Sequence, residues 1–148
     1  MTSIVKQVGH VNHVFLSASI NYLGGRSFYM PNSSRTSSGR ASAILREVPS
    51  EKAFFFYRGI DTPLNISARS LNEFLERITT VEPASLAFHS ERRDFESWVS
   101  MLGDDDLAKK LAGVRGSRLR DEPLRAMLHN TTKNRVEQLS RLRMSASR

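Results

Sequence analysis

The chain has 148 residues, of which 22 are Lys or Arg and 15 are Asp or Glu, giving a net charge of +7. This length fits one domain with ordinary tails, or two very small domains. Because cysteine is absent, a disulfide framework, a thiolate nucleophile and a cysteine-based zinc site are excluded. No apolar run approaches the roughly 18 residues of a transmembrane helix, so the sequence predicts no membrane span.

The N-terminal third is basic and polar. Residues 1–50 carry five Lys or Arg and a single acid, Glu47, and residues 31–43 are rich in serine with little apolar content. Such a stretch cannot bury enough surface to offset its ordering entropy, so we expect disorder over 31–43. Three interpretations of the N-terminus stay open: a flexible arm, an organellar transit peptide, or an over-extended start with the initiator at Met30.

Strand character begins after residue 50. Residues 53–57 form an aromatic run, residues 59–63 have strong turn chemistry, and residues 64–67 alternate apolar and polar side chains. The pattern predicts a β-hairpin, which needs a covering helix for stability. We expect residues 54–57 to lie in the core, with an exposed aromatic face for a partner as the alternative.

A helix over residues 70–81 follows directly. Ser70 and Glu73 form a capping box, in which the hydroxyl and the carboxylate satisfy the first free amides. The apolar side chains that follow share one helical face: Leu71, Phe74, Leu75, Ile78 and Val81.

Three further helical segments are indicated. Pro83 suits the start of a helix over 84–102, whose apolar spacing slips around 89–93 and predicts a break there. Acidic residues at 104–106 favour the start of another helix, which we expect to end at Gly113 or Gly116. Residues 121–123, an acidic pair followed by proline, begin the last helix.

These elements predict a mostly α-helical (α+β) fold. It consists of a small domain of three to four helices with a short N-terminal β-hairpin, preceded by a disordered arm. We expect a flexible basic arm over residues 1–50 and a single small helical domain over residues 51–148.

Two motifs resemble a known family. They are Ser70-Leu71-x-x-Phe74-Leu75 and the longer block His89-x-x-x-Arg93-Asp94-Phe95-x-x-Trp98-Val99-x-x-Leu102-Gly103-Asp104-x-x-Leu107-Ala108. The chain resembles a family of small archaeal and bacterial domains of unknown function over residues 53–112. The family usually has a glycine between the Arg and the Asp, where this chain has none. The resemblance implies a prokaryotic, cytoplasmic protein and implies no activity.

One cluster has the composition of an acid–base site. His89, Glu91 and Asp94 lie within six residues of one another. A general base needs a tuned pKa and a partner that fixes its geometry, and the sequence indicates neither. We therefore interpret His89 and Asp94 as a structural pair at a helix junction and Phe95 and Trp98 as core residues, and we expect no catalytic residue.

Other candidate sites are weak. His10 and His13 are two ligands where a metal site needs three or four. Residues 104–106 lack the alternating ligands and the glycine of a calcium loop. Residues 113–118 resemble a phosphate-binding loop but lack its Gly-Lys-Ser/Thr ending and follow a helix. We expect no metal and no cofactor.

The C-terminal part is the most basic, since residues 107–148 carry eleven Lys or Arg and three acids. A polyanion would be bound by closely spaced cations. The candidates are Arg115, Arg118, Arg120, Arg125, Lys133, Arg135 and Arg141. The alternative is that these charges pair with the acidic middle or keep the domain in solution.

We therefore expect a non-enzymatic, cytoplasmic interaction or regulatory module with an unidentified protein partner, or alternatively a nucleic-acid-binding accessory protein. The oligomeric state stays open.

Overall fold

The computed structural model describes residues 37–145. The three interpretations of the N-terminus and the pair His10 and His13 concern residues outside this range. No helix between residues 37 and 145 is long and apolar enough to cross a membrane.

The first described element corrects the predicted arm. Helix α2 (Ser38–Ile44) begins at Ser37, whose hydroxyl accepts a hydrogen bond from the amide of Arg40 at 3.2 Å. The chain buries Ala41, Ile44, Leu45 and Val48 and packs α2 against α7. Disorder was therefore wrongly predicted for residues 38–43, and the folded part begins well before residue 51. The four apolar residues have helical spacing, but the polar composition around them hid it, and so short a helix forms only where tertiary packing supports it.

The predicted hairpin is present. A short 3-10 turn, η2 (Ser50–Lys52), leads into β1 (Phe54–Gly59), which pairs antiparallel with β2 (Thr62–Ala68). Phe54 lies opposite Ala68, and the register then shifts beyond Phe56. Asn65, on the longer side of this bulge, has a left-handed backbone with φ of 58°.

The helices begin where the sequence signals predicted. Helix α3 (Leu71–Thr80) starts at the Ser70 capping box, and α4 (Pro83–Glu91) starts at its proline. The predicted break separates α4 from α5 (Asp94–Leu102). Helix α6 (Asp105–Gly116) is capped by the Asp104 side chain, and α7 (Asp121–Ser145) completes the fold.

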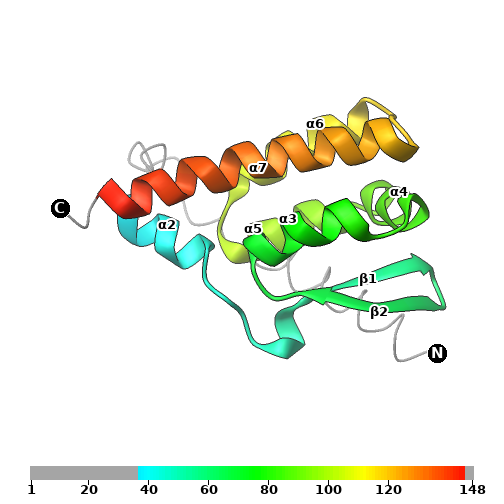
Figure 1. The fold of residues 1–148 in the computed structure, drawn as a ribbon, viewed down its shortest axis with the longest axis horizontal. Helices are drawn as coiled ribbons and strands as arrows, with labels where there is room; N and C mark the ends of the chain where they lie inside the picture. The colour runs from blue at the N-terminus through cyan, green and yellow to red at the C-terminus, as the bar shows by residue number, and fades with distance from the viewer. Residues whose placement is uncertain (1–36, 146–148) are drawn as a thin grey trace, which may run out of the picture.

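These elements form three layers, with the hairpin on one side, α3, α4 and α5 in the middle and the α6–α7 pair on the other side (Figure 1). The mostly helical class with one hairpin is confirmed. The described residues contain six α-helices rather than three to four, because α2 was missed and the 84–102 segment forms two.

Aromatic rings fill the space between the hairpin and the middle helices. Phe54 lies 5.3 Å from Phe95, and Phe74 lies 5.4 Å from Trp98, measured between ring centroids. The Trp98 indole N–H donates a hydrogen bond to the carbonyl of Lys52 at 2.8 Å, so its one polar atom is satisfied. Phe95 and Trp98 are buried, which confirms them as core residues.

Candidate functional site

His89 and Asp94 form a buried polar pair at the α4–α5 junction. His89 lies in the last turn of α4, Asp94 is the first residue of α5, and the His89 Nδ1 lies 2.8 Å from the Asp94 Oδ2. The second ring nitrogen, Nε2, accepts a hydrogen bond from the backbone N–H of Tyr57 at 2.8 Å. Because Nε2 is an acceptor, the ring proton is on Nδ1 and is donated to the carboxylate.

Burial determines the charge of His89. Its exposed fraction is 1%, and desolvation lowers the pKa of the imidazole although the Asp94 carboxylate opposes the shift. Phe54 and Phe95 are among the aromatic rings that pack around it. A neutral ring with both nitrogens bonded to protein groups has no free position for a substrate proton, so the arrangement is that of a structural histidine.

The hairpin bulge explains the contact between Tyr57 and His89. The register shift at Phe56 and Tyr57 interrupts the pairing with β2 at this point. Strand β1 packs against α4, and the Tyr57 amide donates to the imidazole. Glu91, the third member of the predicted cluster, points elsewhere and pairs with Arg120 at 3.1 Å.

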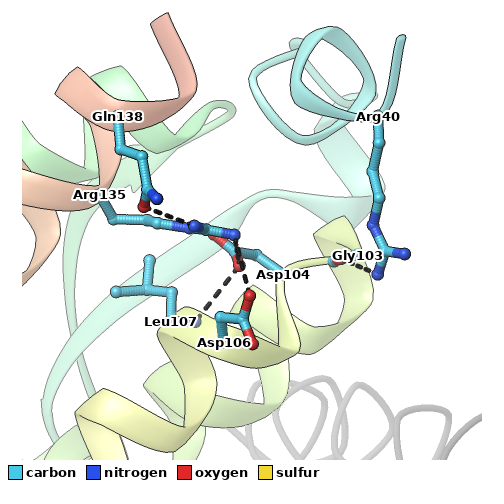
Figure 2. A network of polar contacts seen from close by, with 7 residues as sticks. All are labelled: Arg40, Gly103, Asp104, Asp106, Leu107, Arg135 and Gln138. Atoms are coloured by element: carbon cyan, nitrogen blue, oxygen red, sulfur yellow. Dashed lines mark hydrogen bonds and ion pairs between the residues drawn. The ribbon is translucent and has the colours of Figure 1, made fainter. Parts of the chain in front are cut away.

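A buried ion pair joins Asp104, the N-cap of α6, to Arg135 of α7 (Figure 2). Arg135 donates from Nε and Nη2 to the two carboxylate oxygens of Asp104, at 2.8 and 2.7 Å. The Asp104 carboxylate also accepts from the amide of Leu107, and Arg135 donates a further bond to Gln138. Asp104 is therefore both the N-cap of α6 and the bidentate partner of a buried arginine.

The same junction holds α2. The Arg40 guanidinium donates to the carbonyl of Gly103, and that of Arg46 donates to the carbonyl of Leu102. These carbonyls lie at the C-terminal end of α5, where no following helical turn supplies amides to donate to them. Helix α2 is thus tied to α5 by hydrogen bonds as well as by its buried face.

The seven predicted polyanion-binding residues are separated by the structure. Arg135 is buried, which corrects its assignment to a binding surface. Arg115 pairs with Glu96, Arg120 pairs with Glu91, and Arg125 pairs with Glu122 and donates to the carbonyl of Ile78. The remaining three have exposed side chains without an ion pair among the described residues: Arg118, Lys133 and Arg141.

Within residues 37–145, no group of three or more His, Cys, Asp or Glu side chains is arranged to hold a metal ion. The segment that resembled a phosphate loop is the end of α6, with Gly113 inside the helix.

Two arginines that the sequence analysis did not single out as a pair have unusual backbones. Arg93 and Arg118 have φ of 65° and 59°, the left-handed region that glycine favours. Each lies two residues beyond the end of a helix, α4 for Arg93 and α6 for Arg118. A left-handed non-glycine residue costs about 1–2 kcal/mol, and a cation after a helix C-terminus recovers only about 0.3–1 kcal/mol. Arg93 is in addition the N-cap of α5, where a positive charge is unfavourable, so these arginines add little to stability.

A local signal in the sequence could have shown that Arg135 is buried, but not that Arg93 has a left-handed backbone. Leu128, Thr132, Arg135 and Leu139 share a helical face, which places an arginine on the buried side of α7. The left-handed backbone of Arg93 has no such signal and is visible only in the structure.

The comparison with protein families covers most of the folded part. A family of unknown function, DUF5752, matches residues 36–133, which run from the start of α2 into α7. The chain belongs to DUF5752. The match includes α2, so this helix is part of the DUF5752 domain and not of an arm. No curated protein and no solved structure shows significant similarity to the chain.

Proposed function

We propose that this DUF5752 chain is a small, non-enzymatic, cytoplasmic interaction module. One observation carries the proposal: the only acid–base cluster that the sequence offered has both nitrogens of His89 bonded to protein groups, to Asp94 and to the Tyr57 amide. A catalytic base must be free to meet a substrate proton, whereas this histidine joins β1 to the α4–α5 junction. The groups left for contact with other molecules lie on the surface.

Crosslinking in the native host tests this proposal. The tagged full chain is crosslinked in cells, purified with nuclease treatment and analysed by mass spectrometry. We expect a protein partner that resists nuclease and is recovered equally with His89→Gln, provided that the variant is folded. Loss of the partner from a folded His89→Gln variant would contradict a purely structural role for His89.

Nucleic-acid binding is the second candidate. It is favoured by the exposed Arg118, Lys133 and Arg141, which have no ion pair within residues 37–145, although four of the seven predicted cations are engaged within the protein. Binding of this kind is non-specific and steeply dependent on salt. Fluorescence anisotropy with short RNA and DNA at about 50 and 200 mM salt measures it, and the absence of binding at the lower concentration excludes this candidate.

A further inference from the structure

Two turns from distant parts of the sequence lie side by side. Arg120, after α6, pairs with Glu91 at the end of α4, with Nη2 and Oε1 separated by 3.1 Å. Arg115, near the end of α6, pairs with Glu96 in α5 at 3.0 Å. These pairs flank Arg93 in one turn and Arg118 in the other, so the two ion pairs bring both arginines to the same end of the molecule.

Arg93 and Arg118 are the uncommitted members of this group. Both side chains are exposed, and neither has an ion pair or side-chain hydrogen bond within residues 37–145. Both also occupy left-handed positions that a glycine would fill with less strain. The folded domain therefore does not itself use the two guanidinium groups.

The surrounding charges select the kind of anion. Glu91 and Glu96 pair with two arginines at this end and lower its net positive charge, which disfavours the many phosphate contacts on which nucleic-acid affinity depends. A planar guanidinium binds one carboxylate or one phosphate through two parallel hydrogen bonds, so two guanidinium groups suffice for the few carboxylates of a short acidic segment. The pair of Arg120 with Glu91 is exposed, with side-chain exposures of 70% and 63%, so Arg120 is able to exchange Glu91 for an incoming carboxylate.

We propose that Arg93 and Arg118, with Arg120 beside them, bind an acidic segment of a partner protein. This inference rests on the proposed interaction function and names its surface and the chemistry of its partner.

A peptide-binding experiment tests the surface on the full chain. The probe is a fluorescein-labelled peptide of about eight glutamates, with a glutamine peptide and an oligothymidine of similar length for comparison, at about 50 mM salt, where screening is weak. The variant Arg93→Gly/Arg118→Gly removes both guanidinium groups and leaves residues suited to the backbone. The matched control is Lys109→Ala/Lys110→Ala, which removes two exposed charges from α6.

We expect the arginine variant to bind the glutamate peptide about tenfold more weakly, and the lysine control to stay within about twofold. Arg93→Lys/Arg118→Lys keeps the charge without the planar fork, and we expect an intermediate loss. Circular dichroism and the melting temperature establish that each variant is folded. If the Arg93→Gly/Arg118→Gly variant does not fold, Arg93→Lys/Arg118→Lys takes its place and is compared with the same Lys109→Ala/Lys110→Ala control.

Three results would overturn the inference. An equal loss of affinity for the glutamate peptide in the Arg93/Arg118 and Lys109/Lys110 variants would mean that binding depends only on net charge. Tighter binding of oligothymidine than of the glutamate peptide would assign the surface to a polyphosphate. No binding of the glutamate peptide by the wild-type chain would exclude an acidic segment. If that last result accompanies a nuclease-resistant protein partner in the crosslinking experiment, the surface is wrong but the interaction function stands.

Discussion

Acid should destabilise this domain through His89. The imidazole is 1% exposed, and burial lowers its pKa below the ordinary value of 6.5. Its charged and titratable neighbours are Asp94, Arg92 and Tyr57. Asp94 accepts a hydrogen bond from Nδ1, Arg92 lies beside that carboxylate, and the Tyr57 amide donates to Nε2. Below pH 6.5 the unfolded chain gains a proton at His89 that the folded chain does not take up, so stability is present above this pH and falls as the pH is lowered.

The size of the effect follows from proton linkage. For an unfolded-state pKa of 6.5 and an imidazole that stays neutral in the folded chain, the free energy of unfolding falls by at most about 1.3 kcal/mol between pH 7 and pH 5.5. Such a loss lowers the melting temperature by about 5–10 °C in a domain of up to 100 residues and by somewhat less in a larger one. Protonation of Nε2 would also displace the Tyr57 amide, which lies at a register shift of the hairpin.

Urea unfolding at a series of pH values measures this dependence. The control is His89→Gln, whose amide is able to accept from Tyr57 and donate to Asp94 but does not titrate. The two proteins are otherwise identical, so the difference between the two curves isolates His89. Parallel curves for the wild-type chain and His89→Gln from pH 7 to 5.5 would refute the assignment of a buried, neutral imidazole.

Three further changes test the packing, each by urea unfolding at neutral pH. Trp98→Ala should cost about 3–5 kcal/mol, because Trp98 is 1% exposed at the centre of the aromatic core; near-native stability would place it outside the core. Ile44→Ala should cost about 2–5 kcal/mol, since α2 buries this side chain, and a loss below about 0.5 kcal/mol would mean that α2 is not docked. Arg135→Met alone should cost about 3–5 kcal/mol by leaving Asp104 without its partner, and Asp104→Asn/Arg135→Met should cost less than the sum of the single changes.

The sequence was sufficient to predict most helix starts because their signals are local. A serine followed by glutamate three residues later begins α3, an aspartate cap begins α6, and an acidic pair before proline begins α7. The Ser70 and Asp104 side chains each accept from a backbone amide three residues on, and none of the three signals needs a distant contact. Helix α2 differs, since its Ser37 cap is followed by only seven helical residues in a polar region. Its stability comes from packing on α7, about a hundred residues away in sequence, which local composition does not indicate.

The candidate site was predictable only in part, for a related reason. The structural role of His89 and Asp94 was proposed from their short separation in sequence. The third partner, the Tyr57 amide, depends on a strand bulge that periodicity does not predict. The basic C-terminal residues were grouped by sequence, whereas their partners come from α3, α5 and the α5–α6 junction. Charge density along a chain therefore overestimated the free cationic surface.

The two buried carboxylates explain how α5 is held in place. Asp94 begins α5 and binds His89, which carries the contact on to β1, while Asp104 follows the end of α5 and binds Arg135 of α7. Helix α5 carries Phe95 and Trp98, so fixing both of its ends positions the aromatic core between the outer layers. Because a buried charge is tolerated only when paired, both carboxylates are committed to the fold and are not available for chemistry. The guanidinium groups of Arg93 and Arg118 have no ion pair or side-chain hydrogen bond within residues 37–145, and for this reason the turns, rather than the polar interior, are where a partner should be sought.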